Sequence, residues 1–264
     1  MTIHTTDMTS DGQHRATVRV LSIFEYLTDT ENVGKSLTEI ANYLKAPKSS
    51  ILPILRTLVD FQYLHYNTVT MQYFLGYKLY EIGTKYVGET NVDDAIQQVM
   101  QEFASNYGVT LLLGELVAGD VLVIQKVDLF EKLRLYRAVG RRIPAYSDAS
   151  GKVLLAEKSD AEIMKLYSDG LIAYTEKTIT DPAELFEQLD IVRQTGVATC
   201  DEETTRYVRS VAVPIKKNGS AVYAIEASLS IFEYTEEKER ELILGLYELK
   251  AKIENLIKRS DAVN

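Results

Sequence analysis

Residues 36–64 read SLTEIANYLKAPKSSILPILRTLVDFQYL. Ser36 and Glu39 have the spacing of a capping box, in which the serine oxygen accepts a backbone N–H and the glutamate binds back to the cap residue. We therefore predict a helix that begins just after Ser36. The Lys-Ala-Pro sequence at residues 45–47 ends this helix, and apolar residues recur at helical spacing from Ser49 onward. Two helices joined by such a tight break resemble a helix-turn-helix.

The flanking residues complete a DNA-binding module. Before this stretch, residues 17–27 carry apolar side chains at helical spacing and are predicted to form a first helix. After it, residues 63–66 and 72–75 are rich in strand-favouring residues, and the short polar segment between them predicts a hairpin. Three helices and a hairpin in this order are typical of a winged helix, which we place at residues 15–76.

The third helix supplies the predicted contacts to DNA. In a winged helix this element enters the major groove, where hydroxyl and guanidinium groups bind phosphates and base edges. The alternative is that its polar residues are simply solvated residues of a surface helix. The candidate contacts are Lys48, Ser49, Ser50, Leu52 and Arg56.

Two features of this module bear on DNA binding. Pro53 cannot donate the hydrogen bond of a helix interior, so either the helix starts as late as Ser49, with Pro53 in its first turn, or the helix kinks there. The predicted wing, residues 65–72, contains no lysine or arginine. We therefore expect the contact between this wing and DNA to be weak.

Composition and charge exclude several classes of protein. The chain has 264 residues, of which 46% are hydrophobic and 25% charged, as in ordinary globular domains. No run approaches the roughly 18 to 20 apolar residues of a spanning helix, and the first residues lack the apolar centre of a secretory signal, so we expect a cytoplasmic protein without membrane contact. The net charge of -9 argues against a broadly basic surface, although residues 13–76 are close to neutral.

Metal and cofactor chemistry are also not expected. The chain has one cysteine, Cys200, which permits no internal disulfide, and its three histidines all lie in the first quarter of the sequence. A zinc site in the rest of the chain would need carboxylates almost alone, which zinc sites rarely use. We therefore expect no metal site and no cofactor.

The remainder of the chain is predicted to form a second module of α+β class. Residues 77–91 read as a linker helix and joint, and Asn218-Gly219 supplies the turn of a hairpin. Strands alternate with helices, so we expect a mainly antiparallel sheet flanked by helices over residues 92–264. The module starts with a helix that carries Ala95, Ile96, Val99 and Phe103 on one face. The strand-like runs are residues 110–116, 121–127, 133–138, 208–216 and 221–229, and the later helical stretches are residues 151–157, 160–167, 181–195 and 235–260.

Three segments, in this order, resemble the IclR family of bacterial transcription regulators. The first is LTEIANYLKAPKSSILPILRTLVDFQYL at residues 37–64, similar to the helix-turn-helix of that family. The second is GRRIPAYSDASGKVLLAE at residues 140–157. The third is GVATCDEETTRYVRSVAVPI at residues 196–215, followed by AIEASLS at residues 224–230. The resemblance extends from about residue 15 to residue 260.

The resemblance implies a ligand-responsive DNA-binding regulator and not an enzyme. Its second module would be a GAF/PAS-like effector-binding and oligomerisation domain at residues 92–264, after a flexible tail at residues 1–14. Family members form dimers that often pair into tetramers and bind small metabolites, commonly carboxylates or sugar acids. A homodimer would favour double-stranded DNA with an inverted repeat, because two-fold protein symmetry is mirrored in the operator.

The resemblance also implies an effector site. In family members the backbone amides just before the Gly-Lys pair help to hold the ligand, and these fall here on Ala149 and Ser150. Amides at the start of a helix form an anion site, which gives this assignment a physical basis. Where some members have an aspartate, this sequence has Cys200. The facing wall would be Val208, Ser210, Ser228 and Ser230, of which the last two share one face of a strand.

Two other functions are compatible with parts of the sequence. An enzyme could use Cys200 as a nucleophile, or Asp201, Glu202 and Glu203 as acid–base groups, but no histidine lies beyond residue 65 to activate the thiol. Three consecutive carboxylates more often mark a solvated strand end. The other alternative is a DNA-binding adaptor without a ligand, whose sensor pocket is filled by its own side chains.

Overall fold

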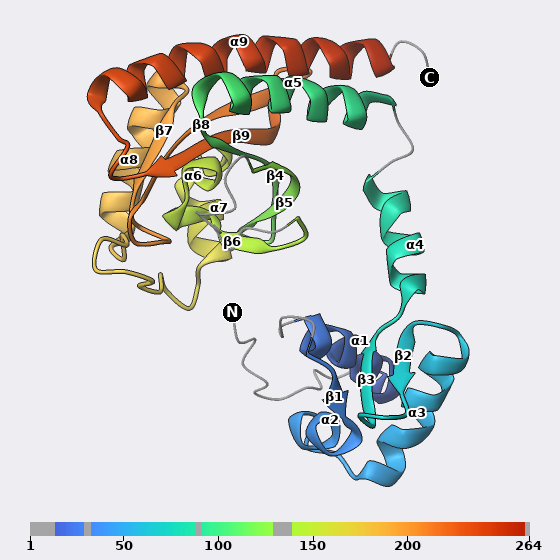
Figure 1. Ribbon diagram of the computed structural model, residues 1–264. Helices are drawn as coiled ribbons and strands as arrows, with labels where there is room; N and C mark the ends of the chain where they lie inside the picture. Colours follow the sequence, from blue (N-terminus) through green and yellow to red (C-terminus); the bar gives the residue numbers. More distant parts are fainter. Residues whose placement is uncertain (1–13, 29–32, 88–90, 129–138, 262–264) are drawn as a thin grey trace. The chain divides into compact units, whose positions relative to one another are not determined.

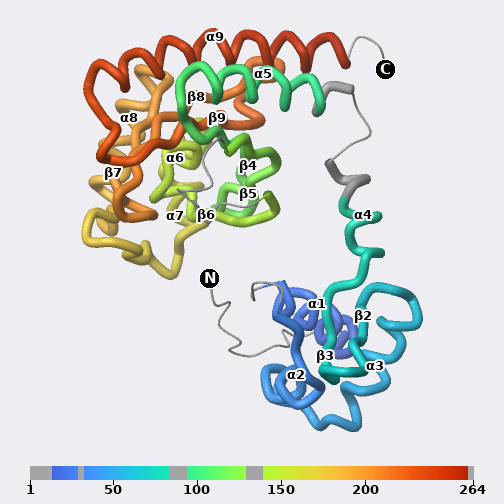
Figure 2. Tube along the Cα trace, in the orientation of Figure 1, coloured from blue at the N-terminus to red at the C-terminus, as the bar shows by residue number. Residues whose placement is uncertain are grey.

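The computed structural model describes residues 14–28, 33–87, 91–128 and 139–261, without the side chains of residues 84–87, 91–93 and 261. Nearly all of the predicted tail, and the predicted strand at residues 133–138, lie outside these ranges. The chain divides into two compact units, Met1–Glu89 and Thr90–Asn264 (Figures 1 and 2). Each unit is described by itself.

The first unit is a winged helix-turn-helix. Its three strands form an antiparallel sheet in the order β1-β3-β2, and β1 pairs with β3 through Lys35–Tyr73 and Ser36–Gln72. The predicted helices and hairpin are present. The elements are α1 (Arg15–Thr28), β1 (Lys35–Ser36), α2 (Leu37–Tyr43), α3 (Lys48–Asp60), β2 (Leu64–Asn67), β3 (Gln72–Leu75) and α4 (Tyr77–Val87).

Local hydrogen bonds define both ends of α2. The capping box forms as predicted, because Ser36 accepts from the Glu39 amide and the Glu39 carboxylate accepts from the Ser36 amide. The helix ends in a Schellman motif, in which the Ala46 amide donates to the Ala41 carbonyl at 3.0 Å. Lys45 takes the left-handed position of this motif, with φ of 47°. This turn directs the chain into α3.

The second unit has a six-stranded sheet in the order β6-β5-β4-β9-β8-β7, in which every neighbouring pair is antiparallel. The predicted turn at Asn218-Gly219 joins β8 to β9, and both residues have positive φ, as a two-residue hairpin turn requires. The helices are α5 (Asn91–Tyr107), α6 (Ala149–Leu155), α7 (Asp160–Leu166), α8 (Pro182–Thr195) and α9 (Glu236–Asp261). The strands are β4 (Thr110–Val117), β5 (Asp120–Val127), β6 (Arg142–Pro144), β7 (Ala198–Asp201), β8 (Val208–Lys217) and β9 (Ser220–Ser230).

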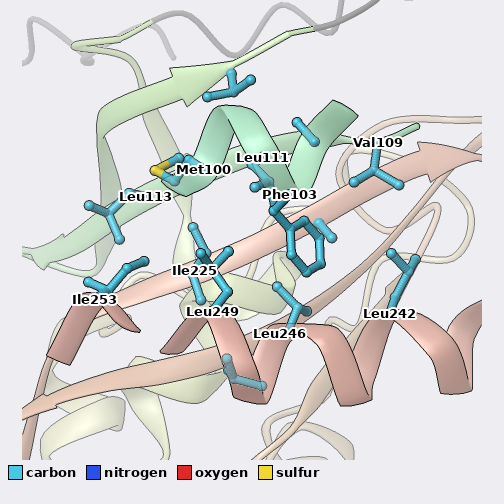
Figure 3. Packing of buried hydrophobic residues seen from close by; sticks show 14 of the residues in the cluster. Met100, Phe103, Val109, Leu111, Leu113, Ile225, Leu242, Leu246, Leu249 and Ile253 are labelled. Atoms are coloured by element: carbon cyan, nitrogen blue, oxygen red, sulfur yellow. The ribbon is translucent and has the colours of Figure 1, made fainter. Parts of the chain in front are cut away.

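Helices cover both faces of this sheet (Figure 1). On one face, α5 and α9 pack side by side, and Figure 3 shows Met100 and Phe103 of α5 meeting Leu246 and Leu249 of α9 over Leu111. On the other face, α6, α7 and α8 pack against a second apolar cluster. A short 3₁₀ helix at Ala145–Ser147 leads directly into α6. The predicted effector residues lie on this second face.

Candidate functional site

The predicted DNA contacts differ in their accessibility along α3. Lys48, Ser49 and Arg56 are exposed, whereas Ser50 and Leu52 are half-buried. The Ser50 hydroxyl donates to the Pro47 carbonyl at 2.8 Å and so closes the first turn of the helix. The exposed residues among the predicted contacts are therefore two cations and one residue with a hydroxyl group.

Pro53 lies in the second turn of α3. The sequence allowed Pro53 to lie in the first turn only if the helix started as late as Ser49. The helix begins at Lys48, so a first-turn position for Pro53 is excluded. The helix nevertheless continues to Asp60, and the Thr57 hydroxyl donates to the Pro53 carbonyl at 3.0 Å. Because Pro53 is exposed, its ring lies on the outer side of the helix, among the exposed candidates for DNA contact.

The wing is a short hairpin whose tip carries no charged residue. The Asn67 side chain accepts from the amides of Val69 and Thr70 at 2.9 and 3.1 Å, which fixes the loop between β2 and β3. Val69 is 90% exposed at this tip. With no cation on the wing, α3 carries the charged part of the predicted surface.

In the second unit, strand pairing brings several predicted effector residues into one row. Cys200, Ser210 and Ser228 are direct partners across β7, β8 and β9, and Thr110 of β4 pairs with Ser228. All four side chains are buried on the face that packs against α6. We call Cys200, Ser210, Ser228 and Thr110 the polar row. Thr110 was not predicted, because its place depends on strand register.

The remaining predicted wall residues lie next to the polar row. Val208 and Ser230 are partners across β8 and β9, two residues along from Ser210 and Ser228. The Ser230 hydroxyl accepts from the Phe232 amide at 3.3 Å, and the Cys200 thiol donates to the Ser147 carbonyl at 3.3 Å. By contrast, the buried Ser210 hydroxyl has no hydrogen-bond partner among the residues that the structure describes.

The amide predicted to hold an effector is bonded to a carboxylate of the protein itself. Ser150 N–H donates to Glu226 Oε2 at 3.0 Å, and Glu226 Oε1 accepts from the Ser228 hydroxyl at 2.8 Å. The Ser150 hydroxyl donates to Asp148. Glu226 and Asp148 are both fully buried. Glu226 was missed in the sequence, although its alternation with Ser228 and Ser230 along β9 places all three on one face.

A buried ion pair links α6 to the segment that follows β7. Lys152 Nζ lies 2.5 Å from Glu203 Oε1 and 2.6 Å from Gln188 Oε1, and its side chain is 1% exposed. Burial raises the pKa of Glu203, and the ammonium of Lys152 opposes that rise. The expectation of a solvated acidic strand end is therefore wrong for Glu203. Its neighbours Asp201 and Glu202 do hold a surface cation, Lys177.

Comparison with known proteins identifies the family. A protein-family model described as "Bacterial transcriptional regulator IclR C-terminal" matches residues 84–255. A second family model, described as "IclR helix-turn-helix domain", matches residues 16–68. The chain belongs to the IclR family. It is thus a DNA-binding transcription regulator, and the enzyme alternative is not supported. No metal-binding group of three or more His, Cys, Asp or Glu side chains occurs in the described part of the chain.

Relatives in the IclR family match along most of their length. The regulator KdgR of Escherichia coli K12 is 29% identical over 240 residues, which covers 89% of this chain and 90% of KdgR. XynR of the same organism is 30% identical over 207 residues, covering 78% and 82% of the two chains. The transcriptional repressor IclR of E. coli K12 is 25% identical over 234 residues, covering 87% and 85%.

Solved structures of IclR regulators share the fold. A regulator from Alicyclobacillus acidocaldarius superimposes with a TM-score of 0.81 at 24% identity, covering 92% of this chain and 99% of that one. An IclR homologue from Microbacterium hydrocarbonoxydans, solved with 4-hydroxybenzoate, gives a TM-score of 0.79 at 20% identity with the same coverage. Among the described residues, no helix has the length and apolar character needed to cross a bilayer.

Proposed function

We propose that this IclR-family chain is a cytoplasmic, metabolite-responsive regulator whose sensor unit binds a small polar molecule at the polar row. The observation that carries the proposal is the set of buried hydroxyls that the sheet gathers beside α6, including Ser210, which has no partner among the described residues. A buried hydroxyl without a partner is costly, and a ligand that bonds to it would remove that cost. The homologue solved with 4-hydroxybenzoate supports a small-molecule role for this fold.

The effector class remains the predicted one, a carboxylate or sugar acid. The hydroxyl groups of a sugar acid match this part of the site, because each sugar hydroxyl can both donate and accept a hydrogen bond. It can donate to the Glu226 carboxylate and accept from the hydroxyl of Ser210 or Ser228. While Glu226 bonds to Ser150, the carboxylate of the effector has to lie elsewhere in the site.

The proposed assembly is a homodimer, which can pair into a tetramer and binds an inverted repeat. Each α3 exposes only Lys48 and Arg56 as cations. Two copies of α3 that bind one operator together would double the number of cationic contacts and raise the affinity for DNA. Repression is the favoured direction, because relatives are named as repressors. The effector can change DNA affinity only through its different affinity for the two arrangements of the DNA-binding units.

Capture of sheared genomic DNA from the source organism tests the DNA-binding role. Full-length protein is expected to retain a few fragments that share an inverted repeat at roughly 50 mM salt and to keep part of them at roughly 200 mM. Sequencing of the retained fragments is the measurement. Retention of fragments without a shared sequence, or of none, would refute a sequence-specific regulator.

Arg56→Ala is expected to weaken binding to the captured operator about tenfold or more, because each guanidinium contact to DNA contributes roughly 1–3 kcal/mol. Titration of a labelled operator gives the Kd. Arg240→Ala is the matched control, since it removes one exposed arginine from α9 and should leave the Kd within about twofold. Equal weakening of operator binding by both variants would show that Arg56 does not contact the operator.

Ser228→Ala combined with Ser230→Ala is expected to abolish the metabolite response and leave operator binding intact. Candidates come from a thermal-shift screen of pyruvate, gluconate and galacturonate against the full chain, and every hit is then tested for release of the operator. Thr199→Ala is the control, because Thr199 lies on β7 with an exposed side chain on the opposite face from Cys200. A response that survives in the double variant would contradict the site.

One observation favours a second candidate function, the adaptor without a ligand. Glu226 already occupies the Ser150 amide and the Ser228 hydroxyl, so the protein fills part of its own site. Under this alternative no metabolite in the screen would raise the melting temperature, while operator capture would succeed. A thermal-shift hit that also releases the operator would exclude it.

A further inference from the structure

The carboxylate of Glu226 lies where a charged ligand group is expected. It is 0% exposed, and its oxygens accept hydrogen bonds from the Ser150 amide at 3.0 Å and from the Ser228 hydroxyl at 2.8 Å. Its strand neighbours at the same level are Ala212 of β8 and Leu112 of β4, which cannot donate from their side chains. A glutamate buried at this level is thus held by the same groups that the sequence assigned to an effector.

A second carboxylate strengthens the exclusion of anions. Asp148 is also fully buried and accepts from the Ser150 hydroxyl, so both polar groups of Ser150 bond to carboxylates of the chain. A third carboxylate entering this space would lose its hydration and lie at short range from two buried acidic side chains. The Ser210 hydroxyl, which lies beside Ser228 in the polar row, has no hydrogen-bond partner among the described residues.

We propose that Glu226 determines effector specificity as a built-in carboxylate: it occupies the Ser150 amide, keeps carboxylates of ligands away from it, and bonds to hydroxyl groups of the effector. This inference rests on the proposed effector function of the polar row. It assigns the hydroxyl-bearing part of the effector to Glu226 and Ser210. A simple carboxylate without hydroxyl groups does not bind at Ser150 in the natural protein.

Acetate rescue tests this role directly. Glu226→Ala keeps Cβ and removes the CH₂–COO⁻ fragment, which acetate replaces almost atom for atom. Acetate is expected to raise the melting temperature of full-length Glu226→Ala by about 3 °C or more at roughly ten times its Kd. Acetamide, which has nearly the same shape without the charge, should have a smaller effect. Sodium chloride at equal ionic strength is the salt reference.

The natural protein and Glu254→Ala are the controls. Glu254 Oε1 accepts from the Lys216 amide at 2.7 Å, so Glu254→Ala also removes a carboxylate from a backbone amide. This amide is half-buried and lies on the α9 side of the sheet, away from the polar row. Neither control should respond to acetate. Glu226→Gln, which keeps the space filled, should also fail to respond.

Three results would overturn the proposal. The first is an equal acetate effect on the natural protein, which would show that carboxylates enter while Glu226 is in place. The second is a folded Glu226→Ala variant that is indifferent to acetate. The third is rescue of Glu254→Ala to the same extent. If Glu226→Ala does not fold in chloride, its refolding is compared in acetate and in acetamide. Refolding in acetate that exceeds refolding in acetamide would support the role of Glu226, and no refolding in either would refute it.

These outcomes are independent of DNA binding. Failure of acetate rescue, with a metabolite that still releases the operator, would remove the role of Glu226 and leave the proposed function standing. Acetate rescue without any metabolite that releases the operator would overturn both the proposed function and the role of Glu226 in effector specificity. It would show only that the Glu226 carboxylate fills the Ser150 amide site, in a protein that acts as an adaptor.

Discussion

Lys152→Met is expected to destabilise the second unit by about 3–5 kcal/mol, because it leaves the Glu203 carboxylate buried without its partner. Urea unfolding of the full chain, followed by circular dichroism, gives the free energy of unfolding. Hydrogen exchange of α6 amides then shows which unit has lost stability. A loss below about 1 kcal/mol would contradict the strength of this buried pair.

The combined variant Lys152→Met and Glu203→Leu separates charge from packing. Replacing both members of a buried pair by apolar residues is often neutral or stabilising, so the double variant should recover most of the loss. Lys158→Met, which removes a half-buried lysine just after α6, is the single-charge control. A double variant as unstable as Lys152→Met would mean that the aliphatic part of Lys152, or its bond to Gln188, carries the effect.

The pH dependence of Lys152→Met has a definite sign. Burial raises the pKa of Glu203 above its value in the unfolded chain, so the folded state binds the extra proton more readily. This contribution favours folding at acidic pH and is lost as the pH rises through the folded pKa. Without the opposing Lys152 the rise is larger. The stability deficit of the variant should therefore shrink as the pH falls from 7 towards about 5.

Gly151→Ala is expected to destabilise the second unit by about 3 kcal/mol or more, since overpacking against rigid backbone cannot relax. A Cβ at Gly151 would lie 2.1 Å from the Ala145 carbonyl oxygen and 2.3 Å from Ala145 Cα. Both are backbone atoms of the 3₁₀ helix that precedes α6, so α6 would have to move. Thermal unfolding of the full chain is the measurement.

Gly83→Ala is the matched control for Gly151→Ala. Gly83 also lies within a helix, but a Cβ there meets no atom within 4 Å. Alanine in an open helix position is stabilising by roughly 0.5–1 kcal/mol relative to glycine. If both variants unfolded like the natural protein, the close approach between α6 and residue 145 would be disproved.

The fold was largely predictable because its main elements have strong local signals. The capping box at Ser36, the turn at Asn218-Gly219 and the long apolar stripe of α9 each specify an element from neighbouring residues alone. The missed strands β1, β6 and β7 have two, three and four residues. Strands this short hold too few residues for an alternating pattern to be distinguished from chance.

The site was less predictable because its decisive contacts are not local. Ser150, Ser210, Ser228 and Ser230 were assigned through the family resemblance, and the structure places them around one region of the sheet. The bond between Ser150 and Glu226 joins residues 76 positions apart. Which acceptor a buried amide finds depends on how α6 packs across β9, and that packing is set by many residues at once.

The turn between α2 and α3 has a lysine where a glycine would be more stable. Glycine is the residue that most easily adopts the left-handed conformation at Lys45, and a lysine there carries a conformational cost of roughly 1 kcal/mol. In return, an exposed ammonium stands three positions before the first residue of α3, at the end of the helix that lies nearest to bases in this kind of module. A chain that is acidic overall, and whose wing is uncharged, thereby places one of its few positive charges beside the helix that is predicted to contact the anionic backbone of DNA.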